Sequence, residues 1–418
     1  MAIYDQIISP QKNKSVIAMK VIEIIQNEIS LAHPEMHKTR LNTLFTFVHS
    51  GLKDQRLTVT YLGRGLKSLS NTEQKHDIKR ADRLCGNTHL HSERIDFYKY
   101  MASSLVVKER NPLLIVDWSP INGSSIFQLL RVSVPMGGRA LTIYEKTYDE
   151  SELNTPTAHQ ALLDNIKYCL PEGCRPIILA DAIFKTPWFK AIENMGWYWV
   201  CRVRGNVQLS KDGENWQQSR EWFLSANSKA VTLGDIYFSK TTQHPCIGTL
   251  YKGRKKGRIK KKLRGGKSQC STDKYQEKKA KEPWLLISCL PQRWDKNPKK
   301  VMRLYATRMQ IEEAFRDTKN AKLGMSLEFA NSRSPERFDI LLLIGALILY
   351  ILWCIGFAAE QLNLHHSLQA NTEKRKRVLS HIYLGREIVN DGRYIVDDAF
   401  IIWVLHELPN LVIRLGSL

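Results

Sequence analysis

The spacing of apolar residues predicts helices along the first hundred residues of the chain. Apolar residues recur at helical intervals in Val16–Ile29, and Lys38–Leu52 repeats the pattern. Two shorter helical patterns follow, Leu57–Leu66 and Lys75–Leu84, with a polar segment between them. Such a break is compatible with a helix-turn-helix-like module, although many small helical bundles share it. We therefore predict a helical domain over residues 1–105.

After residue 111 the pattern changes from helical to strand-like. Three apolar runs separated by turn residues predict a meander, and helical and apolar segments then alternate. In chain order, the predicted elements are strands Leu113–Trp118, Ile126–Val134 and Ala140–Glu145, helix Ala158–Cys169, strand Pro176–Asp181, helix Pro187–Met195 and strand Trp197–Val203. This is the element order of a ribonuclease H-like α/β domain, and we assign residues 106–203 to the first part of such a core.

Residues 204–283 interrupt that plan. They hold two short β-like segments, Ala230–Phe238 and Cys246–Lys252, and then a basic run without apolar periodicity, so we predict a β-rich basic insertion. Strand Trp284–Leu290 and helix Pro298–Lys319 follow it. The domains predicted to complete the chain are the second part of the core (284–370) and a helical C-terminal region (371–418), a candidate for dimerisation.

One apolar run is long enough to span a bilayer. Ile340 to Ala359 contains 20 residues without a charge. A helix buried in a large core has the same composition, and charged residues crowd both ends of this one. Gly345 and Gly356 would let a neighbouring helix approach closely. Because nothing else in the chain resembles a membrane span, we predict a buried core helix and no membrane partner, with a membrane-associated basic protein as the alternative.

The composition is that of an ordinary globular protein. Of its 418 residues, 43% are hydrophobic and 25% are charged, which excludes wholesale disorder, a collagen-like fibre and a small disulfide scaffold. The eight cysteines are scattered without a CxxC pair, and the first ten residues lack the pattern of a signal peptide. We therefore expect free thiols and a cytoplasmic location.

The charge is far from balanced. Sixty-two Lys and Arg residues against 41 Asp and Glu give a net charge of +21, and residues 252–281 carry 14 of these basic residues against two acidic ones. Most charge runs are only solvated, but like charges at this density repel unless a polyanion neutralises them. We predict that the run follows a DNA phosphate backbone. The basic residues assigned to DNA are Lys255, Lys256, Arg258, Lys260, Lys261, Lys262 and Arg264.

Two acidic residues stand at or near the ends of predicted apolar strands, Asp117 and Asp181. Strand ends are where an α/β sheet presents its chemistry. Two carboxylates held close together need a cation, and oxygen ligands suit Mg²⁺. A single such Asp more often caps a turn or a helix, but two on the first and fourth strands of this order favour a metal site.

The predicted helix after the insertion offers a third carboxylate. At about 100° per residue, one polar stripe about 80° wide carries an aromatic residue, three cations and one carboxylate. These residues are Tyr305, Arg308, Glu312, Arg316 and Lys319. Glu313 falls outside the stripe. Taken alone, the stripe favours an ordinary solvent-facing surface on which Arg308 and Glu312 pair.

The spacing within this stripe carries a family resemblance. Tyr305, Arg308, Glu312 and Lys319 match Y-x2-R-x3-E-x6-K, the signature of the insertion-sequence-four family of DDE transposases. The segments ILADAIFK, GWYWVCRVRG and SPERFDILLLI are similar to the transposon-ten transposase branch, and the likeness runs from about residue 35 to 390. It implies that the N-terminal helices bind DNA.

The resemblance implies cut-and-paste transposition. Such enzymes bind the terminal inverted repeats of an element, excise it through a hairpin intermediate and join it to target DNA. In that family three carboxylates hold two divalent metal ions, so the resemblance assigns two Mg²⁺, or Mn²⁺ in their place, to Asp117, Asp181 and Glu312.

The resemblance also implies the DNA contacts and the assembly. It assigns Trp284 to stacking on a flipped base, and Tyr305, Arg308 and Lys319 to neighbouring phosphates. It implies double-stranded DNA as the partner, a homodimer in the synaptic complex, and a place near the bacterial nucleoid. The main alternative is an inactive or domesticated relative that binds DNA without cutting it, although the intact carboxylates argue against that.

Overall fold

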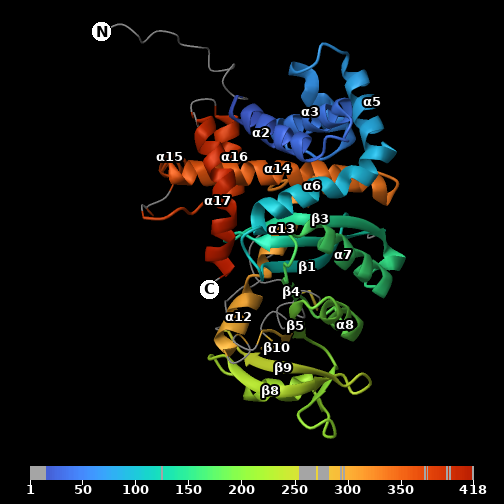
Figure 1. The fold of residues 1–418 in the computed structure, drawn as a ribbon, viewed down its shortest axis with the longest axis vertical. Helices are drawn as coiled ribbons and strands as arrows, with labels where there is room; N and C mark the ends of the chain where they lie inside the picture. Colours follow the sequence, from blue (N-terminus) through green and yellow to red (C-terminus); the bar gives the residue numbers. More distant parts are fainter. Residues whose placement is uncertain are drawn as a thin grey trace. The chain divides into compact units, whose positions relative to one another are not determined.

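The computed structural model describes residues 16–123, 126–253, 270–271, 282–291, 294, 297–370, 373, 375–391, 394 and 397–416. The chain divides into two compact units (Figure 1). Unit 1 combines the residues up to Cys174 with those from Met309 onward, and unit 2 comprises Arg175–Arg308. These units do not follow the five predicted segments, whose boundaries stay predictions. Both units combine helices with β-strands, so the α/β class is confirmed.

Unit 1 packs helices on a three-stranded antiparallel meander. The strands are β1 (Leu113–Pro120), β2 (Phe127–Pro135) and β3 (Ala140–Asp149), in the order β3-β2-β1. The helices are α2 (Val16–Ala32), α3 (Lys38–Asp54), α4 (Val59–Arg64), α5 (Gln74–Cys85), α6 (Thr88–Val106), α7 (Pro156–Cys169), α13 (Met309–Lys319), α14 (Pro335–Gln361), α15 (His365–Leu368), α16 (His381–Asn390) and α17 (Asp398–Gly416). Side-chain oxygens of Thr58, Asn87 and Thr155 cap α4, α6 and α7, which explains where these helices begin.

Helix α14 forms the centre of unit 1. It lies between α2 and α3 on one side and α6 with strand β3 on the other (Figure 1). It is long and apolar enough to cross a membrane, but its most apolar 18-residue window is 100% buried in the structure, as expected of a core helix. A Cβ on Gly356 would lie 1.8 Å from the carbonyl oxygen of His381 in α16, so glycine permits this close helix crossing.

Unit 2 is built on one mixed sheet. Its strands are β4 (Ile177–Ala180), β5 (Tyr198–Val203), β6 (Gln208–Ser210), β7 (Gln217–Gln218), β8 (Val231–Phe238), β9 (His244–Tyr251) and β10 (Trp284–Cys289), in the order β4-β5-β10-β9-β8-β6-β7. The helices are α8 (Thr186–Asn194), α9 (Ser219–Trp222) and α12 (Pro298–Ala306). Helix α8 connects the parallel pair β4–β5, and Phe189 of α8 stacks on Trp199 of β5 at 4.1 Å between ring centroids. Strands β8 and β9 form where the insertion was predicted, and β9 pairs with β10, so they extend the sheet.

Candidate active site

In unit 1, Asp117 belongs to a row of charged residues that crosses all three strands. Strand β1 continues to Pro120, so Asp117 lies within the strand and not at its end. The strand register places Asp117 opposite Arg131 of β2, and Arg131 opposite Glu145 of β3. Residues directly opposite in an antiparallel pair share one face of the sheet. The row therefore lies on one face, and the Asp117 side chain is half-buried there.

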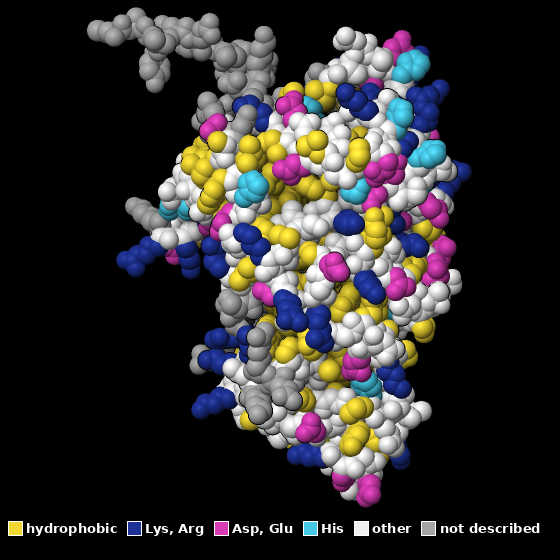
Figure 2. Space-filling view, in the orientation of Figure 1, with side chains coloured by type: hydrophobic (Ala, Val, Ile, Leu, Met, Phe, Trp, Pro, Cys, Tyr) yellow, Lys and Arg dark blue, Asp and Glu magenta, His cyan; other side chains and the backbone are white. Residues whose placement is uncertain are grey.

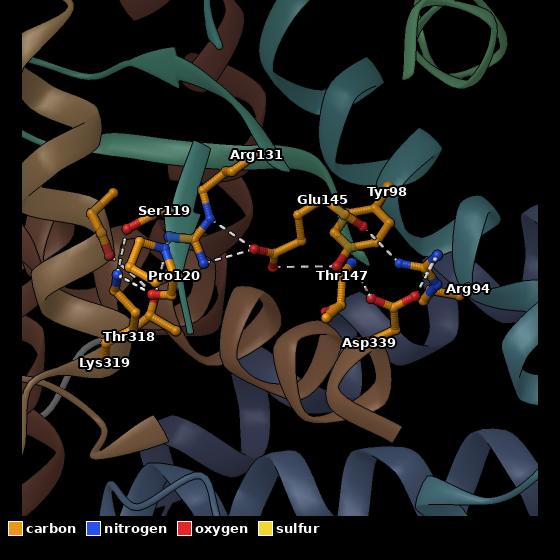
Figure 3. A network of polar contacts seen from close by, with 11 residues as sticks. Arg94, Tyr98, Ser119, Pro120, Arg131, Glu145, Thr147, Thr318, Lys319 and Asp339 are labelled. Carbon is orange, nitrogen blue, oxygen red and sulfur yellow. Dashed lines mark hydrogen bonds and ion pairs between the residues drawn. The ribbon is translucent and has the colours of Figure 1, made fainter. Parts of the chain in front are cut away.

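Helix α13 is fixed to the sheet at its C-terminal end (Figure 3). Arg131 Nη1 donates to the hydroxyl of Thr318 at 3.1 Å. The ammonium group of Lys319 donates to the Ser119 hydroxyl and, at 2.9 Å, to the Pro120 carbonyl of strand β1. Burial and the charge of Arg131 lower the pKa of Lys319 to about 8, against the opposing attraction of Asp117. Lys319 is therefore held beside the strand that carries Asp117.

Two neighbouring carboxylates on α13 lie in different surroundings. Glu313 pairs with Arg316 on its own helix and with Arg139, whose Nη1 lies 3.4 Å from its carboxylate. Glu312 is exposed to solvent in the first turn of the helix. Glu313 therefore has a structural role in ion pairs, and it is the motif spacing that makes Glu312 the candidate ligand.

The predicted single helix Pro298–Lys319 is wrong, because the structure breaks it between Ala306 and Met309. The amides of Thr307 and Arg308 donate to carbonyls only three residues back, and the Thr307 hydroxyl donates to the Leu304 carbonyl at 2.7 Å. These short-range bonds replace the α-helical pattern. The 80° stripe therefore does not run unbroken, and the motif divides between α12 with its turn in unit 2 and α13 in unit 1.

In unit 2, Asp181 directly follows strand β4, as the sequence predicted. Its carboxylate accepts a hydrogen bond from the amide of Ile183 at 2.8 Å, and its carbonyl accepts one from the thiol of Cys201. These contacts fix the backbone on both sides of Asp181. The side chain is half-buried and is therefore partly accessible at the surface of this unit.

The structure brings together three residues that the motif assigns to DNA. The Trp284 and Tyr305 rings meet edge to face, with centroids 5.2 Å apart, and the Arg308 guanidinium lies 5.9 Å from the centre of the Tyr305 ring. Tyr305 is buried, and burial raises its pKa to about 12. Trp284 is half-buried, and Tyr251 of β9 contacts it edge-on. Part of the Trp284 surface is therefore accessible, whereas the buried Tyr305 ring packs against Trp284 and Arg308.

Arg202 is a member of this cluster that the sequence analysis missed. Its side chain lies opposite Leu286, on the same face as Trp284, and only 8% of the residue is exposed. Its Nε has no hydrogen-bond partner among the described residues, and its Nη2 donates to the carbonyls of Glu282 and Pro283, each at 3.3 Å. Burial and the charge of Arg204 lower its pKa to about 10. A buried cation next to other cations is a place where an anion would bind favourably.

Most of the predicted basic run belongs to parts of the chain that the structure does not describe. Lys255, Lys256, Arg258, Lys260, Lys261, Lys262 and Arg264 all lie outside the described residues. On the face that Figure 2 shows, the Lys and Arg side chains of the described residues form several small groups among Asp and Glu. The role of the basic run in DNA binding stays a prediction.

In the described part of the chain, three side chains of unit 1 lie as close together as metal ligands do. His33, Glu35 and Asp96 bring their ligand atoms within 4.8 Å of one another. His33 is already paired with Glu35 at 3.0 Å, and Asp96 accepts a hydrogen bond from Tyr168 at 2.8 Å. These two polar contacts near the surface account for the proximity of the three side chains without a metal ion.

Comparison with known proteins gives one informative result. The family model described as the transposase DDE domain matches residues 110–351, more than half of the chain, and includes Asp117, Asp181 and Glu312. A solved synaptic complex of the piggyBac transposase with hairpin DNA is similar at 13% identity, over 97% of this chain and 86% of that chain, with a TM-score of 0.39. No curated protein matches the sequence.

Proposed function

Because the chain belongs to the transposase DDE domain family, we propose that it moves a DNA element by cut-and-paste transposition. It is a DDE transposase, an enzyme that acts on DNA, and enzymes of this family use divalent metal ions. The observation that carries the proposal is the family match over residues 110–351 together with the spacing of Tyr305, Arg308, Glu312 and Lys319 inside it. This spacing supports placing the chain in the insertion-sequence-four family, near the transposon-ten branch.

The proposal assigns Asp117, Asp181 and Glu312 to a site for two Mg²⁺ ions. The donor set fits, because all three groups are carboxylates and none is fully buried. When bound, the ions offset the charge of the reacting phosphate and activate the attacking oxygen. Phosphoryl transfer depends on such charge neutralisation and on in-line placement more than on covalent groups from the protein. The element order β1-β2-β3-α7-β4-α8-β5 supports a ribonuclease H-like core for this site.

The remaining residues of the motif act on the DNA. Water first cleaves one strand at each end of the element and leaves a 3′-hydroxyl. That hydroxyl attacks the opposite strand and closes a hairpin, which water reopens before the end is joined to target DNA. Sharp bending of the strand requires a flipped base, which Trp284 would stack on while Arg308 and Lys319 hold adjacent phosphates. The edge-to-face contact of Trp284 with Tyr305 supports this role, because it fixes the Trp ring.

The family resemblance also supports a homodimer in the synaptic complex. In such an assembly each subunit cleaves the transposon end that the other subunit binds. The helical C-terminal region is the proposed contact between the two copies.

A cleavage assay tests the proposed function. The purified protein is incubated with Mg²⁺ and a linear fragment that carries its own gene with several hundred flanking base pairs. We expect discrete double-strand breaks at both flanks and hairpin-length products on denaturing gels, both lost in Asp181→Asn. A mobility shift without any cut, in Mg²⁺ or in Mn²⁺, would overturn the proposal in favour of a DNA-binding protein that does not cleave.

A further inference from the structure

Unit 2 contains a pocket that no part of the proposed mechanism uses. Its volume is about 350 Å³, at the lower end of the range for ligand sites. It lies between the start of α8, the segment that leads into β6, and the turn from β8 to β9. Lys185, Asn206, Gln208 and Lys240 contribute to its wall, together with the buried Phe238.

The pocket has the chemistry of a phosphate site. Two lysines line it, and none of its described lining residues is acidic. Thr186, at the first position of α8, and Thr242 of the opposite turn also line it, and their hydroxyl groups lie 2.9 Å apart. This contact ties the two sides of the pocket together. Lys185, Lys240 and Thr242 are exposed, so these side chains are accessible from solvent.

One of the two cations is tied to the candidate active site. The Lys185 ammonium donates to the carbonyl of Ala182 at 2.7 Å, and Ala182 directly follows Asp181. The same loop is held by the bond from the Ile183 amide to the Asp181 carboxylate. The Lys185 ammonium group is therefore bonded to the residue that directly follows a proposed metal ligand in the chain. A strand whose reacting phosphate is at Asp181 would bring its neighbouring phosphates toward the pocket.

We infer that this pocket binds the phosphodiester backbone of the DNA strand whose reacting phosphate lies at Asp181. The lysines contact phosphate oxygens, and the side-chain amides of Asn206 and Gln208 donate hydrogen bonds to the same backbone. The inference rests on the proposed function, since it takes the strand at Asp181 to be DNA. It adds a binding site outside the motif, on the side of Asp181 formed by α8 and the β8–β9 turn.

The salt dependence of DNA binding tests the inference without requiring cleavage. The charge-removing variant Lys185→Gln/Lys240→Gln is compared with wild type in mobility-shift titrations, in EDTA, on the fragment that carries the chain's own gene. The matched control is Lys190→Gln/Lys229→Gln, which removes two exposed lysines of the same unit that do not line the pocket. Loss of two phosphate contacts should reduce the slope of log K against log salt by about 1.8, whereas the control should leave it unchanged.

A second measurement does not depend on any variant. Acetylation of lysines, read by mass spectrometry, should show Lys185 and Lys240 protected by saturating DNA and Lys190 and Lys229 unprotected. Equal slope changes in the two variants, or equal protection of all four lysines, would overturn the inference. Failure of this inference can be distinguished from failure of the proposed function. If the wild-type protein cleaves DNA but the Lys185→Gln/Lys240→Gln variant keeps the wild-type salt slope, only the inference about the pocket is wrong. If the variant has a reduced salt slope but the wild-type protein does not cleave DNA, only the proposed transposition is wrong.

Discussion

Arg131 and Glu145 form a buried ion pair on the sheet face that carries Asp117. The Arg131 Nε and Nη2 atoms lie 2.7 and 2.6 Å from the same carboxylate oxygen of Glu145, and both side chains are at most 1% exposed. Through its third nitrogen Arg131 reaches Thr318 of α13. The pair therefore links the strands to the helix that carries Glu312 and Lys319 (Figure 3).

Removing one partner of this ion pair should lower the free energy of unfolding substantially. Glu145→Gln removes the carboxylate charge that is hydrogen-bonded to the buried Arg131, so we expect a loss of about 3 kcal/mol in the free energy of unfolding. Urea denaturation at pH 7 measures it. The double variant Arg131→Met/Glu145→Leu removes both charges and should lose less than Glu145→Gln alone. A single variant as stable as wild type would show that the pair does not hold this region together.

A buried histidine predicts how unfolding depends on pH. His159 of α7 is 5% exposed and lies 3.2 Å from the indole Nε1 of Trp118, the neighbour of Asp117. Burial lowers the pKa of His159 from 6.5 to about 4. The pKa of His159 is lower in the folded than in the unfolded protein. Its contribution to the free energy of unfolding is therefore fully present above pH 6.5 and is lost as the pH falls toward 4. The loss amounts to about 3 kcal/mol.

Comparison of wild type with His159→Gln isolates this contribution. Gln does not titrate and can still accept a hydrogen bond from the indole, so the variant should lose less stability between pH 7 and pH 4 than wild type does. Chemical denaturation across that range provides the measurement. Parallel pH profiles for the two proteins would rule out a neutral, buried His159.

Lys319 should make DNA binding depend on pH. With a pKa of about 8 it is mostly charged at pH 7 and mostly neutral at pH 9. If the bound phosphate keeps it protonated, DNA affinity should fall about tenfold between these pH values. Lys319→Arg remains charged and should show little of this fall. Anisotropy titrations in EDTA compare the two, and an equal fall in both proteins would show that another group is responsible.

The elements that carry the candidate site were predictable because their patterns are strong. The apolar run before Asp181 predicted strand Pro176–Asp181, and the observed strand β4, Ile177–Ala180, is one residue shorter at each end. The meander from β1 to β3 followed from three apolar runs separated by turn residues. The break after Ala306 was not predictable, because apolar residues keep helical spacing across it and neither Thr nor Arg excludes a helix.

The buried charges could not be located from the sequence for a different reason. Arg131 and Glu145 stand inside runs that look like ordinary strands, and only the strand register places them opposite each other. Arg202 likewise lies in an apolar strand, and its burial depends on the packing of β5 against β10. Sequence periodicity predicts which residues share a face, but it does not predict which strands become neighbours.

The most direct test of the catalytic assignment compares two adjacent carboxylates on α13. Glu312→Gln should abolish cleavage of the flanking DNA in Mg²⁺ while DNA binding in EDTA is retained. Glu313→Gln removes only the ion pairs with Arg139 and Arg316 and no proposed metal ligand. This variant should therefore still cleave DNA, and its free energy of unfolding should fall by only about 1 kcal/mol. Cleavage by Glu312→Gln at the wild-type rate, or its loss in Glu313→Gln alone, would contradict the account.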